Sequence, residues 1–403
     1  MPAKSTLGYR NINNIPLYYC TGCMACSALC PLQCISITAD EEGFIIPRAE
    51  EINCTNCGIC ISRCPSLHDM EKNAPLHVFA FQAKDRTVAR SSSSGGAAAL
   101  ITEEILRGHG TVYGCIMDEM LKVRHIRITH MEERQRLVGS KYVQSDFSEV
   151  YRTIKQDCES GSPTCVFGTP CQIAGVRSFL SQDYANLLLV DLICHGVPSQ
   201  WLFDEYLKWK AKHMKGERII SYKFRDKTKY DWGLSYRATT ATAVTIDVAI
   251  ADPFYQALTY AETNRESCYQ CKYASVERVG DITIGDFWGI QTQHPEWKTK
   301  CKDGVSAVLV NTEKGHSLFE RIAGQADVTV STIEKASAEN SNLCTPSKRP
   351  EIRDIYYRSV KERSFSWANR YSAKRYYMDM IKKIVPGPVK KLIKKSIKRI
   401  KRT

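Results

Sequence analysis

The chain has 403 residues, which suits two or three domains with a buried core, and 43% hydrophobic with 25% charged residues is ordinary for a globular protein. The sequence has no visible export signal and no apolar run near the roughly 18 residues of a membrane span, so we expect an intracellular protein. The net charge is +13, but eight Lys or Arg residues lie in Val389–Thr403 and the remainder is only mildly basic. The 18 cysteines are far more than a soluble enzyme needs, and in a reducing compartment metal ligation explains them better than disulfides.

A duplicated cysteine motif lies near the start of the chain. "CTGCMACSALCP" begins at Cys20 and "CTNCGICISRCP" at Cys54, and both follow the pattern CxxCxxCxxxCP at an offset of 34 residues. In two-cluster ferredoxins, three closely spaced cysteines bind one [4Fe-4S] cluster and the cysteine before proline binds the other. We therefore predict one ligand set of Cys20, Cys23, Cys26 and Cys64, and another of Cys54, Cys57, Cys60 and Cys30.

The alternative to this interpretation is a pair of zinc knuckles. Such sites usually show two-by-two Cys or Cys/His spacing, without a third close thiol and a proline-flanked fourth. Cys34 lies outside the repeated pattern, and we interpret it as a small buried residue.

Alternating strand and helix signals follow Pro65 and are typical of an α/β domain. Short apolar runs that end in Gly or Pro turns predict buried parallel strands feeding helices. The expected strands lie at 77–84, 111–117, 163–170 and 186–198, and the expected helices at 97–107, 171–180 and 199–212. A β-rich stretch covers about 219–250, further strands begin near Gly280 and Gly304, and residues after about Ile333 are polar and predicted helical.

The predicted fold is an α/β core domain with β-rich insertions at 74–335. We expect a small α+β domain like a bacterial ferredoxin before it, at 10–70. A polar helical region at 336–403 follows and ends in a short basic amphipathic C-terminal helix.

The segment "ESCYQCKYA", from Glu266, holds an isolated CxxC pair, Cys268 and Cys271. Alone, this pair fits a redox dithiol, half of a zinc site or half of an iron–sulfur site.

A series of motifs occurs in one order between Ala74 and Thr312: "SSSSGGAAAL" from Ser91, "VYGCIMDEMLKVRHIRI" from Val112, "GSKYVQS" from Gly139, "VFGTPCQIAGVRSFL" from Val166, "DLICHGVPS" from Asp191, "RESCYQCKYA" from Arg265 and "GDITIGDFWG" from Gly280. Together they resemble the family of coenzyme F-420 hydrogenase/dehydrogenase beta subunits, and the cysteine repeat resembles the ferredoxin domain fused to many members. The resemblance implies an FAD flavoprotein with its own [4Fe-4S] cluster. Some members exchange a hydride with the deazaflavin F-420, and others reduce different substrates. The implied ligands of the third cluster are Cys171, Cys194, Cys268 and Cys271. Cys171 and Cys194 each follow a predicted buried strand, where a loop can bring the CxxC pair beside them.

The "SSSSGG" turn that opens the 97–107 helix is a candidate cradle for the flavin pyrophosphate, because glycine lets backbone N–H groups approach anionic oxygens at a helix N-terminus. A simple helix cap is the alternative. The resemblance adds "GSKYVQS", where the alternative is a solvated lysine beside a core tyrosine, and "GTPCQ", which we expect near the flavin. The flavin candidates are Ser94, Gly95, Gly96, Ser140, Lys141, Tyr142, Gln144, Thr169 and Pro170.

The segment "FRDKTKYDWG", from Phe224, suits binding of an anionic planar molecule by charge and stacking. An exposed basic loop is the alternative. The substrate candidates are Arg225, Lys227 and Trp232, with Lys229 between them. His195, beside Cys194, is either a proton relay or a structural histidine.

These parts predict an FAD- and iron–sulfur-dependent oxidoreductase, because a flavin converts between hydride chemistry and single-electron transfer. The expected route joins a hydride donor or acceptor, reduced F-420 or another small molecule, to ferredoxin or a partner redox protein through FAD and three clusters. One alternative is a non-catalytic electron-transfer subunit; another is a ferredoxin-dependent reductase without F-420. A third is a DNA- or membrane-associated iron–sulfur structural or sensing protein, although no base-reading motif supports nucleic-acid binding.

The C-terminal tail is amphipathic if helical. Its apolar side carries Val389, Leu392, Ile393, Ile397 and Ile400, and lysines and arginines fill the remainder. This pattern predicts peripheral contact with an anionic membrane at its cytoplasmic face. A solvated tail, or nonspecific contact with nucleic acid or an acidic partner, is the alternative.

Overall fold

The computed structural model describes residues 8–384, with side chains described through residue 375. The strands are β1 (Ile35–Ala39), β2 (Ile45–Ala49), β3 (His77–Ala83), β4 (Thr111–Met117), β5 (Val123–Ile128), β6 (Thr164–Gly168), β7 (Leu187–Leu192), β8 (Ser221–Lys223), β9 (Ser235–Thr239), β10 (Val244–Val248), β11 (Ile282–Asp286), β12 (Ser306–Val310) and β13 (Ala326–Val330). The α-helices are α1 (Ala25–Leu29), α2 (Ile59–Ser62), α3 (Arg86–Ser91), α4 (Ala97–Arg107), α5 (Arg134–Leu137), α6 (Tyr151–Glu159), α7 (Pro170–Leu180), α8 (Gln200–Lys212), α9 (Pro253–Thr259), α10 (Ile290–Gln293), α11 (Glu313–Ala323), α12 (Ile333–Ser337), α13 (Arg353–Glu362) and α14 (Phe365–Ile384).

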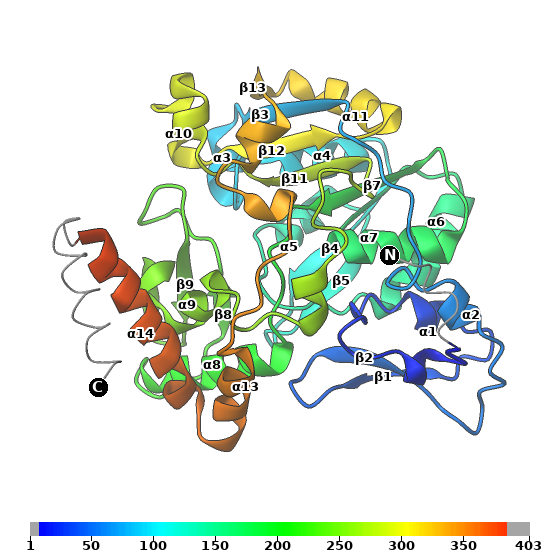
Figure 1. The fold of residues 1–403 in the computed structure, drawn as a ribbon. Coiled ribbons are helices and arrows are strands. Elements are labelled where there is room, and N and C mark those ends of the chain that lie inside the picture. Colours follow the sequence, from blue (N-terminus) through cyan, green and yellow to red (C-terminus); the bar gives the residue numbers. More distant parts are fainter. Residues whose placement is uncertain (1–7, 385–403) are drawn as a thin grey trace, which may run out of the picture.

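One large mixed sheet forms the centre of the α/β region, with strand order β13-β3-β12-β11-β7-β6-β4-β5 (Figure 1). Strands β4, β6, β7 and β11 run parallel to their neighbours in that group. Antiparallel strands flank them on both sides. The prediction of buried parallel strands that feed helices is confirmed, since β6 leads directly into α7.

Helices cover both faces of this sheet, as buried parallel strands require. On one face, Val112 and Val190 pack with apolar residues of α4 and α11. On the other face, Tyr113 and Leu189 pack with residues of α6 and α7. Consecutive strand residues therefore point to opposite helical layers, which explains why these strands are apolar throughout.

The N-terminal cysteine repeat forms a separate small layer. Strands β1 and β2 pair as an antiparallel hairpin, and the short helices α1 and α2 pack together. In Figure 1 this unit lies at one end of the molecule, beside α6 and α7. Helix α1 contacts α7, so the repeat is seated against the large sheet's helical layer.

The predicted β-rich stretch is a second, three-stranded antiparallel sheet in the order β10-β9-β8. It shares an aromatic core with α8, α9, α13 and α14, which includes Phe203, Tyr206, Phe224 and Tyr255. Helices α12 to α14 occupy parts of the region after Ile333 that the structure describes. The predicted membrane-binding tail, Val389–Thr403, lies outside the described residues. Within residues 8–384, none of the helices combines the length and apolar character needed to cross a bilayer.

Candidate cofactor sites

The first cysteine set comprises Cys20, Cys23, Cys26 and Cys64, and all four line one cavity. Cys64 comes from the second copy of the motif but lies with the three cysteines of the first copy, which is the exchange of the fourth ligand expected for a two-cluster ferredoxin. Burial raises the pKa of Cys23, Cys26 and Cys64, and the charges of neighbouring thiols raise it further. Such a group of thiols is unfavourable as bare thiolates and needs a cationic centre to ionise together.

The second cysteine set comprises Cys30, Cys54, Cys57 and Cys60, which line another cavity. Cys60 is buried, whereas Cys57 is exposed. The same cavity is also lined by Cys34, which is buried as predicted and whose Sγ lies 3.4 Å from Sγ of Cys30. The sequence pattern thus missed a fifth thiol at this site.

The third cysteine set comprises Cys171, Cys194, Cys268 and Cys271, which the fold brings together from three separate segments. Burial raises the pKa of Cys194 to about 12, and the charges of Cys171 and Cys271 add to this. Burial likewise raises the pKa of Cys268, with the charges of the other three thiols contributing. Cys171 and Cys271 also pack against one hydrophobic cluster, so the segments after β6 and β7 and the CxxC segment converge.

The donor chemistry of all three sets fits iron–sulfur clusters, whose ligands are cysteine thiolates. Among the described residues, no three His, Cys, Asp or Glu side chains form a group suited to holding a single metal ion. Ligands of a multi-iron cluster surround a larger body and stand further apart than those of one ion.

The first and third sets are neighbours across helix α7. Cys171 lies in the first turn of α7, and Gly175 follows it by one turn on the same helix. A Cβ added at Gly175 would lie 3.3 Å from Sγ of Cys23 and 2.5 Å from the hydroxyl of Tyr151. That hydroxyl donates a hydrogen bond of 2.6 Å to the carbonyl of Cys23. The absence of a side chain at 175 therefore allows the cysteine repeat to approach the third set.

Arg265 joins the same two sets from the other side. Its Nε donates to the carbonyl of Cys20 at 2.7 Å, and its Nη1 donates to the carbonyl of Ile45 at 2.9 Å. Arg265 stands three residues before Cys268, so one side chain fixes the first cysteine loop against the segment that carries the CxxC pair. The first set also borders the second, because Cys26 and Cys64 of the first set pack in the same hydrophobic cluster as Cys60 of the second.

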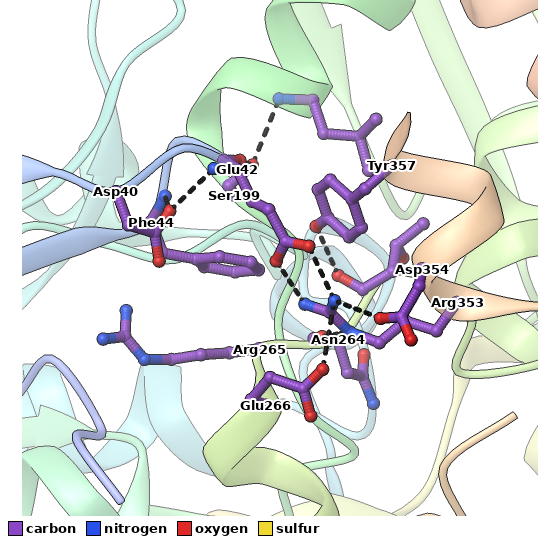
Figure 2. Close-up of polar contacts among 12 residues, drawn as sticks. Asp40, Glu42, Phe44, Ser199, Asn264, Arg265, Glu266, Arg353, Asp354 and Tyr357 are labelled. Atoms are coloured by element: carbon purple, nitrogen blue, oxygen red, sulfur yellow. Dashed lines mark hydrogen bonds and ion pairs between the residues drawn. The ribbon is translucent and has the colours of Figure 1, made fainter. Parts of the chain in front are cut away.

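A network around the buried Arg353 ties the C-terminal helices to this assembly (Figure 2). The guanidinium donates from both Nη atoms to the carboxylate of Glu42, in the β1–β2 turn, at 2.7 and 2.5 Å. Its Nε donates to the carbonyl of Asn264 at 3.0 Å, and Glu266 lies 3.1 Å from Nη1. Sequence reasoning missed these residues because Glu42 and Arg353 are 311 positions apart.

The Ser/Gly loop proposed for the flavin opens α4 as expected, with Gly96 at the N-cap, φ +96°, and no side-chain cap. An N-terminus without a side-chain cap fits an anionic group. Gly95 has a packing role, since a Cβ there would collide with the carbonyl of Phe81. The N–H of Ser140 donates to Ser93 Oγ at 2.7 Å, which brings the loop and the "GSKYVQS" segment together.

The other flavin candidates have specific protein partners. Lys141 is not a solvated lysine: burial lowers its pKa to about 8, and its Nζ donates to the carbonyls of Leu137 and Val138. Tyr142 accepts from Nη1 of Arg225 at 3.0 Å. Gln144 is turned toward the N-terminal hairpin, because its Oε1 accepts from the N–H of Ile45 at 2.9 Å.

Thr169 and Pro170 begin α7 beside the third set. Thr169 is the N-cap residue, Pro170 follows at the first helical position, and Thr169 Oγ1 lies 3.2 Å from Cys171 Sγ. Both therefore help to place Cys171.

A buried polar chain that the sequence did not suggest runs toward this helix start. His125 Nε2 lies 3.1 Å from the carbonyl of Phe167, so that nitrogen carries the proton and Nδ1 accepts from the hydroxyl of Ser145 at 3.1 Å. Ser145 Oγ in turn accepts from Gln172 Nε2 at 2.9 Å, and Gln172 Oε1 accepts from the N–H of Thr169 at 3.0 Å. Burial lowers the pKa of His125 to about 3, which keeps the imidazole neutral.

The alternative of an exposed basic loop is wrong for Arg225 and Lys227, which are both buried. Arg225 pairs with Asp286 at 2.7 Å, and Trp232 Nε1 donates to the same carboxylate at 2.8 Å. Trp232 also stacks on Trp288, with ring centroids 4.8 Å apart.

Lys227 donates to the carbonyls of Ala89 and Ser94, and burial lowers its pKa to about 7. It therefore ties "FRDKTKYDWG" to the Ser/Gly loop. Lys229, by contrast, is exposed. His195 is exposed and its Nε2 lies 2.8 Å from Asn340 Oδ1, a contact that favours the structural alternative.

Comparison with known proteins identifies two matched regions in this chain. Residues 162–336 match the family model that describes the C terminus of the coenzyme F420 hydrogenase/dehydrogenase beta subunit, and residues 19–67 match the 4Fe-4S dicluster domain. One of the F420H2 dehydrogenase subunits of Methanosarcina mazei is 22% identical over 327 residues, covering 77% of this chain and 84% of that protein.

The coenzyme F420-dependent sulfite reductase of Methanocaldococcus jannaschii is 21% identical over 335 residues. The match covers 78% of this chain but only 48% of that longer enzyme. A chain of the F420-reducing [NiFe] hydrogenase complex of Methanosarcina barkeri superposes with a TM-score of 0.44 at 15% identity, over 75% of this chain and 93% of that one. Residues 162–336 therefore resemble the C terminus of coenzyme F420 hydrogenase/dehydrogenase beta subunits, and residues 19–67, which precede them, resemble a 4Fe-4S dicluster domain.

Proposed function

We propose that this chain is an FAD-dependent iron–sulfur oxidoreductase that passes electrons between a small hydride donor or acceptor and a redox partner protein, in the cytoplasm. Coenzyme F420 is the first candidate for the small molecule, because the names of both curated relatives include it. The observation that carries the proposal is the contact at Gly175, where the third cysteine set adjoins the first across one turn of α7.

In this proposal each cysteine set holds a [4Fe-4S] cluster. The first set is the middle member of the series, because Cys23 packs in one cluster with Cys171 of the third set and Cys26 packs in another with Cys60 of the second. The second set, with the exposed Cys57, is the end at which a ferredoxin or another redox protein docks. We place the ferredoxin-type unit at 10–70 and the flavin-binding unit at 74–335.

The flavin would be held by the N-terminus of α4 and by Ser140 and Lys141. The segment that carries these two residues is attached to the loop before α4 by the hydrogen bond from Ser140 to Ser93. When bound, FAD supplies the exchange between a two-electron hydride and single electrons. Lys141 contributes a positive charge close to that site, and the His125–Ser145–Gln172 chain fixes the start of α7 and hence the position of Cys171. Arg225 and Trp232, held together by Asp286, supply a cation and an aromatic face for an anionic planar substrate.

An anaerobic reduction experiment tests this function. The purified chain, with its iron, sulfide and FAD measured, is mixed separately with reduced F420, NAD(P)H and reduced ferredoxin while flavin and cluster absorbance are followed. We expect reduced F420 to bleach the flavin and then the clusters. In the Cys268→Ala variant we expect flavin reduction to persist while reduction of the first and second sets slows strongly.

The rival function is non-catalytic electron transfer within a larger complex. The Methanosarcina mazei relative is itself named as a subunit, and this keeps the rival open. Clusters without tightly bound FAD, reduced only by another protein, would favour that rival. A ferredoxin-dependent reductase without F420 would be favoured by flavin reduction with ferredoxin alone.

A further inference from the structure

The cavity of the second cysteine set contains one thiol more than a four-ligand cluster uses. Cys34 lines it together with Cys30, Cys54, Cys57 and Cys60. The cysteines that line the cavity of the first set are only Cys20, Cys23, Cys26 and Cys64. In the second copy of the repeat, the position equivalent to Cys34 is His68, whose Nε2 lies 3.0 Å from the carbonyl of Ile61. The extra thiol is therefore specific to one of the two sites.

The backbone holds Cys34 in this position. The N–H of Gln33 donates to the carbonyl of Cys30 at 3.1 Å, and Gln33 adopts a left-handed conformation with φ +51°. This tight turn directs the chain back so that Sγ of Cys34 lies 3.4 Å from Sγ of Cys30. Cys34 lies just before β1, and its carbonyl accepts a hydrogen bond of 2.8 Å from the N–H of Glu50. The two thiols are thus presented to the cavity side by side.

Cys34 shares its cavity with Cys54 as well as with Cys30. A thiol that lines this cavity and lies 3.4 Å from Sγ of Cys30 is placed to bind the same cluster as Cys30. Cys34 is 3% exposed, whereas Cys30 is partly exposed.

We propose that Cys30 and Cys34 are interchangeable ligands for the fourth position of the second cluster. The inference rests on the proposed function, since it requires a [4Fe-4S] cluster in this cavity. In an exchange, the Cys34 thiol loses its proton and forms a bond to iron, the Cys30–iron bond breaks, and the released Cys30 thiolate takes up a proton. No electron is gained or lost. A reserve ligand at the site with the exposed Cys57 protects the cluster that is most open to solvent.

The test compares iron content and low-temperature EPR spectra of anaerobically purified, reduced variants. Cys30→Ala and Cys34→Ala are each expected to retain about twelve irons per chain, and the double variant to fall to about eight. The matched control is Cys64→Ala, which removes the equivalent ligand of the first set, where no fifth cysteine lines the cavity, and should fall to about eight irons. Retention of the other clusters in each variant reports that the chain has folded. We expect the EPR spectrum of Cys30→Ala to change at one cluster only.

The outcomes separate this inference from the proposed function. If Cys30→Ala loses about four irons, as Cys64→Ala does, Cys34 cannot replace Cys30 and the inference is overturned. Loss of the cluster in Cys34→Ala alone would overturn it too, since Cys34 would then be the required ligand. Equal iron content in the Cys30→Ala/Cys34→Ala double variant and in the wild type would show that the cluster needs neither thiol, and this would also overturn the inference. Absence of iron from the second set in the wild type would refute the proposed function itself.

Discussion

Gly175→Ala tests the contact on which the proposed electron route depends. The new methyl carbon would stand 2.5 Å from the Tyr151 hydroxyl, 3.2 Å from Cys23 Cβ and 3.3 Å from Cys23 Sγ. The first distance is impossible without movement, and the other two are tight. Overpacking of a close-packed site costs about 1–3 kcal/mol. Either Tyr151 turns away from the carbonyl of Cys23, or the loop of the first set withdraws from α7.

The assay follows iron release from the anaerobic protein in the presence of an iron(II) chelator, with EPR to identify the cluster that is lost. If the strain is relieved when the site opens, release from the first set should accelerate roughly 5- to 150-fold, which is about 1–3 kcal/mol expressed as a rate. Gly324→Ala is the matched control, because a Cβ at that position meets nothing within 4 Å. Equal release rates for Gly175→Ala and Gly324→Ala would refute the contact.

Tyr151→Phe provides a second arm. It removes the oxygen nearest to the new methyl group, but it leaves the buried Cys23 carbonyl without its donor, at a cost of about 1–3 kcal/mol. Because the two changes share one clash, the double variant should lose less stability than the sum of the single variants. Strict additivity would mean that Gly175 and Tyr151 do not act on each other.

Three further predictions concern the framework around the sites. Glu42→Gln replaces the carboxylate that accepts two hydrogen bonds from Arg353, whose side chain is 1% exposed. This change should lower the free energy of unfolding, measured by denaturant titration, by about 1–3 kcal/mol. Glu41→Gln is the control and should have no effect, because the Glu41 side chain is 93% exposed. His125 is neutral in the folded protein, so the unfolded chain binds an additional proton at this residue as the pH falls from 6.5 toward 3. In that range the free energy of unfolding of the wild type should fall by up to about 1.4 kcal/mol per pH unit more than that of His125→Gln. Parallel pH profiles of the two proteins would contradict this. Arg265→Gln loses two hydrogen bonds to the carbonyls of Cys20 and Ile45, and should release iron from the first set faster while sparing the second, as EPR of partly depleted samples can show.

Local patterns predicted the regular elements well. The expected helix at 97–107 and strand at 111–117 coincide with α4 and β4, because serine, glycine and apolar periodicity act within a few residues. The repeat also predicted that Cys64 would lie with Cys20, and Cys30 with Cys54, since the cross-over is built into the spacing of the motif.

Long-range partners were not predictable from the sequence. Arg225 and Lys227 looked like part of an exposed basic loop, yet Arg225 is buried because Asp286, 61 residues away, pairs with it. The buried His125–Ser145–Gln172 chain joins a strand, a loop and a helix, and no spacing rule identifies it. Cys34 belongs to neither copy of the cysteine motif, so the sequence did not predict its contact with Cys30. That contact depends on the turn at Gln33.

The iron content of Cys268→Ala tests the central claim most directly. This substitution removes one thiol of the third set and leaves the dicluster repeat intact. The account predicts about twelve irons per chain in the wild type and about eight in the variant, with EPR signals of the first and second clusters retained. An unchanged iron count in the folded variant would contradict the third cluster and, with it, the proposed route from the flavin to the dicluster domain.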